Sequence, residues 1–132
     1  NLRYALAEDK LIALLLRNPD YGPQLLQEIA PGEFVTDQNR SIFAVLYERL
    51  RAGKSIDPVI LSSELTAEQM SRISYLLAAN REQGFSMAAA REYIAVIRDK
   101  QKERTPEQVG SIDESELDAF VREIAAKKMK QQ

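Results

Sequence analysis

The chain has 132 residues, of which 45% are hydrophobic and 29% charged, a balance typical of one globular domain with a real core. Eighteen Lys and Arg against twenty Asp and Glu give a net charge of −2, which argues against a module that binds nucleic acid through bulk charge. The absence of Cys and His excludes disulfides, Cys-based zinc sites, thiolate nucleophiles and the commonest general base.

No segment is suited to a membrane. The longest uninterrupted apolar run, Leu11–Leu16, is far shorter than the ~20 residues that span a bilayer. Charged residues within 2–16 are incompatible with the apolar region of a signal peptide. We therefore expect a cytoplasmic location and no membrane partner. Because the first residue is Asn1 and not Met, we also expect the chain to be a piece of a longer protein.

Apolar residues recur at helical spacing along most of the chain. The first three helices are predicted at residues 6–16, 23–29 and 37–52. The first ends at Asn18-Pro19, because the residue before a proline avoids helical angles. The third begins at a cap on Thr36 or Asp37 and ends before Gly53. Their predicted core-facing residues are Ala7, Leu11, Leu14, Leu15, Ile42, Phe43, Leu46 and Leu50.

Three more helices follow, after two short segments with an extended pattern, Glu33–Val35 and Ser55–Asp57. A short helix is predicted to open with Asp57 as its cap. The next begins at a capping box between Thr66 and Gln69 and runs to about residue 80. The sixth begins at Ser86. The inward-facing residues of the last two are predicted to be Met70, Ile73, Leu76, Leu77, Ala90, Tyr93, Ile94 and Ile97.

Beyond Ile97 the apolar stripe stops while good helix formers continue, which predicts a solvated stalk. Residues 105–112 are the candidate joint, with Thr105-Pro106-Glu107 as a helix start and Gly110-Ser111 as a break. A seventh helix is predicted from Asp113 to about Lys130. The fold is therefore predicted to be all-α: a bundle of about six helices in residues 1–97, then a stalk and a C-terminal helix or short helical hairpin in residues 98–132.

The residues predict no catalytic, cofactor or metal site. The two acidic clusters, Glu8-Asp9 and Asp113–Asp118, are interpreted as structural, because adjacent carboxylates on a helix point apart and first-turn acids complement the helix dipole. The five glycines form no phosphate-binding loop. The densest basic patch, at residues 100–104, is interrupted by acids and is interpreted as a solvated helix face.

The seventh helix carries the candidate partner-binding surface. Its apolar stripe consists of Leu117, Phe120, Val121 and Ile124. The stripe either folds back on the bundle or docks in a groove of a partner protein, and both interpretations stay open. An enzyme fragment and a nucleic-acid-binding helical domain are the remaining classes. Turnover by the isolated chain would favour the first, and a salt-dependent shift of single-stranded DNA would favour the second.

Several of these residues resemble a known family over about residues 5–104. They are Ala7-Glu8 followed by Leu11, Leu14, Leu15 and Leu16; Glu33-Phe34; Arg40-Ser41-Ile42-Phe43 with Leu46 and Leu50; Gly53 and Ile56-Asp57; and Glu92-Tyr93-Ile94 with Ile97-Arg98. This distributed signature resembles the C-terminal helicase-binding domain of bacterial DNA primase. The N-terminal domain of the replicative hexameric helicase has a similar fold and signature, and it is the alternative.

Three features favour the primase. Residues 127–132 are a charged tail like a natural C-terminus, the segment after Ser71 lacks the Gly-Gly pair that the helicase domain commonly has, and a stalk with a terminal helix resembles the primase layout. Residues 105–132 are shorter than the usual primase hairpin.

The resemblance implies a non-catalytic module without cofactors that binds the replicative hexameric helicase. It would recruit primer synthesis to the fork and modulate the helicase, with no direct contact to nucleic acid. The zinc-binding and primer-synthesising domains would lie in the parent primase.

Overall fold

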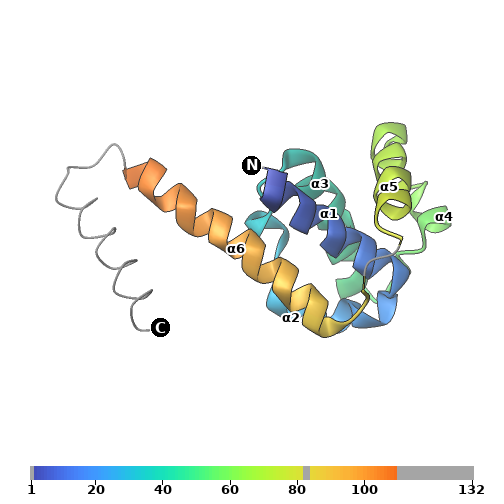
Figure 1. The fold of residues 1–132 in the computed structure, drawn as a ribbon. Helices are drawn as coiled ribbons and strands as arrows, with labels where there is room; N and C mark the ends of the chain where they lie inside the picture. Colours follow the sequence, from blue (N-terminus) through green and yellow to red (C-terminus); the bar gives the residue numbers. More distant parts are fainter. Residues whose placement is uncertain (1, 82–83, 110–132) are drawn as a thin grey trace. The chain divides into compact units, whose positions relative to one another are not determined.

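The computed structural model describes residues 2–81 and 84–109, and contacts group Asn1–Arg98 into one compact unit (Figure 1). Its elements are α1 (Leu2–Arg17), the 3₁₀ turn η1 (Pro19–Tyr21), α2 (Gly22–Glu28), the 3₁₀ turn η2 (Pro31–Glu33), α3 (Asp37–Arg51), α4 (Pro58–Leu61), α5 (Ala67–Ala79) and α6 (Met87–Val109). No strand occurs in these residues, and the predicted all-α bundle of about six helices is confirmed. The predicted division of the chain into a bundle (residues 1–97) and a tail (residues 98–132) stays a prediction. The predicted seventh helix lies outside the described residues and stays a prediction too.

Helix α1 lies at the centre of the core. Its predicted stripe is buried as expected, and so are residues beyond that stripe: Ile12 and Ala13 have no exposed surface, and Leu16 is 6% exposed. Contacts with α3, α5 and η1 cover α1 on several sides. A helix that is apolar around most of its circumference is one that neighbours surround.

The third helix provides the aromatic part of the core. Ile42, Phe43 and Leu46 are fully buried, as predicted, and Leu50 is half-buried. Phe43 stacks on Phe34 with ring centroids 4.5 Å apart. Phe34 follows η2, and its backbone is extended without joining a strand. The pattern of Glu33–Val35 therefore marks the end of η2 and a short linker anchored by the buried Phe34, and not a β-strand.

Two of the helix starts that were predicted from capping residues have the expected hydrogen bonds. Gln69 N donates to Thr66 Oγ1 (3.1 Å) and Thr66 N donates to Gln69 Oε1 (2.9 Å), so the predicted capping box is confirmed. Asp57 Oδ1 accepts a hydrogen bond from Val59 N (2.9 Å) at the start of α4. At α3 the result differs: Thr36 is the cap residue, but its side chain makes no capping hydrogen bond.

Gly53 ends α3 in a left-handed conformation, with φ +71°. Because a Cβ is disfavoured at such an angle, we expect Gly53→Ala to lower the free energy of unfolding by about 1 kcal/mol. Gly32→Ala is the matched control, since a Cβ there meets nothing within 4 Å and no positive φ is present. Urea denaturation of both variants measures the difference, and equal midpoints would contradict the expectation.

The sixth helix packs through its predicted stripe and continues further than expected. Ala90, Ile94 and Ile97 are buried, and Tyr93 is half-buried. The prediction that Thr105-Pro106-Glu107 starts a new helix was wrong, because α6 runs without interruption through Val109. A proline removes one backbone donor from a helix, and the helix formers on both sides of Pro106 outweigh that loss.

Candidate functional site

A buried polar cluster joins α1, α3 and α5. The side chain of Glu8 on α1 is fully buried. Its Oε2 accepts a hydrogen bond from Val35 N (2.6 Å), and both carboxylate oxygens lie within 3.4 Å of Thr36 N. These donors are the amides of the last linker residue and of the N-cap residue, so Glu8 fixes the chain where it enters α3. An N-cap side chain would instead accept from an amide inside the first turn.

Asn39 and Arg72 complete this cluster. Asn39 Nδ2 donates to Glu8 Oε1 (3.3 Å) and to Asp9 Oδ1 (2.8 Å), and Arg72 Nη2 on α5 donates to Asp9 Oδ1 (2.7 Å). The prediction that the carboxylates of Glu8 and Asp9 point apart was therefore wrong, because one amide group binds both. Their role is structural: they hold three helices together through charge-assisted hydrogen bonds.

Donors engage both carboxylates of this cluster. Glu8 is fully buried and Asp9 is 8% exposed. Among residues 2–81 and 84–109, no group of three or more acidic side chains is placed to hold a metal ion. In the same residues, no helix has the length and apolar character needed to cross a membrane.

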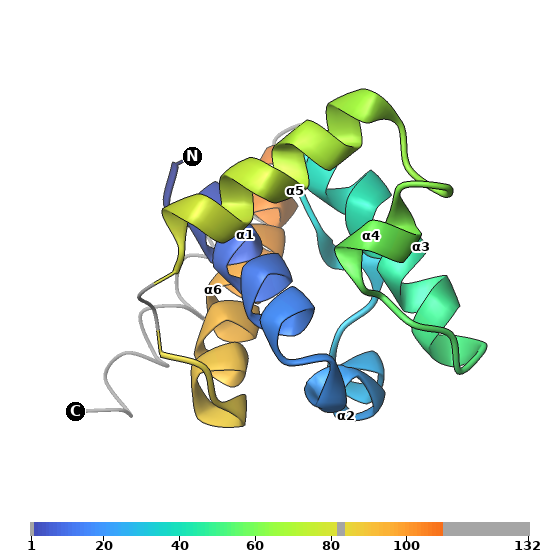
Figure 2. The same ribbon diagram turned by 90° about the vertical axis from the view of Figure 1, so that its right-hand side faces the viewer.

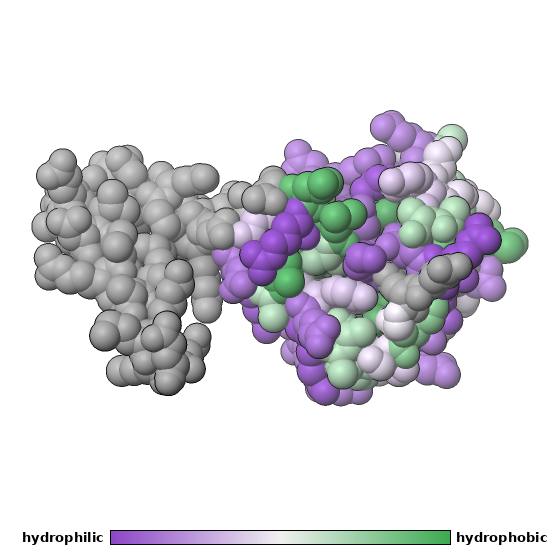
Figure 3. Space-filling model, viewed as in Figure 1, coloured by the Kyte–Doolittle hydropathy of each residue, from purple (hydrophilic) through white to green (hydrophobic). Residues whose placement is uncertain are grey.

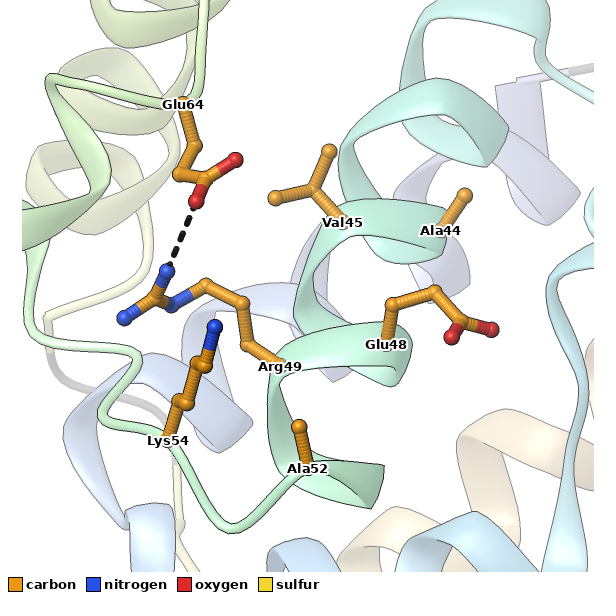
Figure 4. A pocket seen from close by; sticks show the side chains of 7 residues that line it. All are labelled: Ala44, Val45, Glu48, Arg49, Ala52, Lys54 and Glu64. Atoms are coloured by element: carbon orange, nitrogen blue, oxygen red, sulfur yellow. Dashed lines mark hydrogen bonds and ion pairs between the residues drawn. The ribbon is translucent and has the colours of Figure 1, made fainter.

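One shallow groove lies beside α3, with a volume of 380 Å³. Figure 4 shows its lining, which consists of Ala44, Val45, Glu48, Arg49, Ala52, Lys54 and Glu64. The guanidinium of Arg49 is held in place, since it donates to Glu64 Oε1 (3.0 Å) and to the backbone oxygen of Ser55 (2.6 Å). A small apolar floor with a paired ion at its edge suits a contact surface better than an enclosed catalytic pocket.

Two exposed apolar surfaces lie elsewhere on the described bundle. On α4, Val59 is 81% exposed and Ile60 is 45% exposed. On α1, Leu2 and Leu6 are exposed, and Figure 3 shows hydrophobic residues over the N-terminal half of this helix. Sequence reasoning missed both surfaces. The available signal was that Leu2 and Leu6 repeat at i and i+4 and lie off the predicted core stripe.

The predicted partner-binding residues Leu117, Phe120, Val121 and Ile124 lie outside the described residues, so that surface stays a prediction.

Comparison with known proteins identifies the type of bundle. The model of the DnaB-like helicase N-terminal domain family matches residues 3–99. No curated protein and no solved structure matches the chain. The matched segment coincides with the compact unit that ends at Arg98.

Proposed function

The chain belongs to the DnaB-like helicase N-terminal domain family, and from this membership we propose that it is a protein-docking module that binds a replicative DNA helicase. The family match over nearly the whole helical bundle is the observation that carries this proposal. Helical domains of this type are non-catalytic parts of DNA replication proteins. A bundle whose buried carboxylates serve to hold helices together fits such a role.

The finer proposal is that the module belongs to a bacterial DNA primase. The resemblance over residues 5–104 to the helicase-binding domain of primase supports it. The module would recruit primer synthesis to the fork in the cytoplasm and modulate helicase activity. It would need no cofactor of its own, and the zinc-binding and primer-synthesising parts would belong to the parent protein.

A second candidate is the N-terminal domain of the helicase itself, which the family match favours. The two candidates differ in what they bind. A primase module binds an intact helicase hexamer through the hexamer's N-terminal collar. The helicase's own N-terminal domain is already part of that collar, so the isolated domain would associate with copies of itself.

Analytical size exclusion of the full 132-residue chain with a purified bacterial helicase hexamer separates these candidates. We expect the chain to co-elute with the intact hexamer and not with a hexamer that lacks its N-terminal domains. Self-association of the chain without co-elution would favour the helicase domain. Failure of the chain both to co-elute and to self-associate would overturn the docking function.

We expect Phe120→Ala to weaken helicase binding by ~2 kcal/mol or more, roughly thirtyfold. Aromatic residues are favoured anchors of interfaces, and Phe120 is the aromatic residue within the predicted stripe. Calorimetric titration measures the change, while circular dichroism and thermal melting of the variant should match the parent.

Val59→Ala is the control for this prediction, because it also truncates an apolar side chain and that side chain is exposed on α4. We expect it to bind helicase like the parent. If Phe120→Ala lowers the melting temperature as well, the seventh helix belongs to the folded core. If Phe120→Ala leaves both stability and binding unchanged, the interface lies on the bundle.

A further inference from the structure

The exposed charges of α1 are all of one sign. Arg3, Lys10 and Arg17 are spaced by seven residues, which is close to two helical turns, so they lie along one side of the helix. Arg3 and Arg17 are exposed, and Lys10 is partly exposed. The two acids of α1, Glu8 and Asp9, are both buried. The outer surface of α1 is therefore basic, although the whole chain has a net charge of −2.

This basic side borders α5, which lies across α1 (Figure 2). Lys10 Nζ donates to Asn80 Oδ1 (3.4 Å), and Arg17 Nη2 donates to the backbone oxygen of Leu77 (2.7 Å). Ala13, between them, is fully buried. The N-terminal half of α1 is less covered, since Leu2 is 74% exposed and Leu6 is 44% exposed.

An exposed aromatic residue of α5 contacts the arginine that pairs with α1. Asp9 on α1 and Arg72 on α5 form an ion pair of 2.7 Å. Leu6 lies one turn before Asp9, and Tyr75 lies one turn after Arg72. The guanidinium carbon of Arg72 is 5.5 Å from the centroid of the Tyr75 ring. Tyr75 is 59% exposed. Leu6 and Tyr75 are therefore each one helical turn from a member of this ion pair.

The α1–α5 face is defined by three apolar residues and four basic ones: Leu2, Leu6, Tyr75, Arg3, Lys10, Arg17 and Arg72. We propose that this face docks an amphipathic helical segment of a partner protein, with Asp and Glu residues along the edges of the segment's apolar stripe. Exposed aliphatic side chains bind other apolar side chains, and Arg3, Lys10 and Arg17 beside them select an acidic partner. Arg72 contributes less to this selection, because Asp9 already balances its charge.

One observation favours a protein segment over single-stranded DNA. Single-stranded DNA is bound by successive aromatic side chains on which bases stack, and this face offers one exposed aromatic residue beside two exposed leucines. An exposed acid, Glu68, lies beside the face in the first turn of α5, and it repels phosphates and carboxylates alike. This proposal concerns the bundle alone, so its failure would leave the proposed role of the tail intact.

Fluorescence anisotropy of the full chain with two labelled model peptides tests the proposal. Each peptide has about 18 residues, enough for a helix, with Leu at i, i+3, i+4 and i+7 and either Glu or Lys at the flanking positions. We expect the chain to bind the Glu peptide and to bind the Lys peptide at least about tenfold more weakly. Added salt should lower the affinity for the Glu peptide.

Variants locate the binding. Leu6→Gln and Tyr75→Ala should each lower the affinity for the Glu peptide about tenfold or more. Val59→Gln, which removes an exposed apolar side chain from α4, should leave that affinity unchanged. All three positions are exposed, so thermal melting should match the parent. Equal binding of both peptides, loss of binding in Val59→Gln, or no effect of Leu6→Gln and Tyr75→Ala would overturn the proposal. Salt-sensitive binding of labelled oligothymidine that depends on Tyr75, without binding of the Glu peptide, would assign the face to single-stranded DNA instead.

Discussion

Replacing Phe43 by Ala is expected to lower the free energy of unfolding by about 3–5 kcal/mol, the usual range for truncating a buried phenylalanine. Phe43 has no exposed surface, and its ring stacks on that of Phe34 at 4.5 Å. Tyr47, one turn later on α3, lies 6.3 Å away and extends the aromatic contacts. The substitution removes these contacts and leaves a cavity that the surrounding helices fill only partly.

Urea denaturation and thermal melting followed by circular dichroism measure this effect. A loss of 3–5 kcal/mol should lower the melting temperature by more than about 10 °C in a domain of this size. Phe43→Leu keeps more of the volume and should cost less, and Val59→Ala, at an exposed position, should stay within about 0.5 kcal/mol. Melting of Phe43→Ala within a degree or two of the parent would mean that the core face of α3 has been assigned wrongly.

The parts of the fold that depend on neighbouring residues were predictable from the sequence. The capping box of Thr66 and Gln69, the cap at Asp57 and the left-handed Gly53 each involve residues within a few positions of one another. Their physical cause is the set of unpaired backbone groups at a helix end, which nearby side chains satisfy. Such signals need no knowledge of the tertiary structure.

The parts that depend on distant residues were not predictable in the same way. Periodicity identified which side of α1 is apolar, but it does not say how many neighbours surround the helix, so the burial of Ile12 and Ala13 was missed. Residues 105–107 show a further limit. Proline is common at the first position of a helix, yet here Pro106 lies within α6. A single residue cannot distinguish these two positions.

The candidate surfaces show the same division. Leu2, Leu6 and Tyr75 are recognisable as a surface only once the Asp9–Arg72 ion pair, 63 residues apart in sequence, brings α1 and α5 together. The stripe at Leu117, Phe120, Val121 and Ile124, by contrast, follows from helical spacing alone and stays a prediction. Sequence periodicity can propose an amphipathic face, but which faces remain exposed is decided by tertiary packing.

The second large effect is expected at Glu8, whose carboxylate binds the backbone amides that lead into α3, 27 and 28 residues away in sequence. Glu8→Gln keeps the size of the side chain but provides one acceptor oxygen in place of two, and its NH₂ group would face the donors of Val35, Thr36 or Asn39. A buried donor without a partner costs about 1–3 kcal/mol, and hydrogen bonds to a charged group are worth more than neutral ones. We therefore expect Glu8→Gln to lower the free energy of unfolding by about 2–3 kcal/mol, and Glu8→Ala by more.

Hydrogen exchange distinguishes the loss of these hydrogen bonds from a general loss of stability. In Glu8→Gln the amides of Val35 and Thr36 should exchange faster than the global unfolding of the variant requires, while amides in the middle of α5 should follow global unfolding. Glu48→Gln is the matched control, because that carboxylate on α3 is 71% exposed and should change stability by no more than about 0.5 kcal/mol. If Glu8→Gln were as stable as Glu48→Gln, the carboxylate would not be what fixes the entrance to α3, and the hydrogen bonds from Asn39 to Asp9 and from Arg72 to Asp9 would be what holds α1, α3 and α5 together.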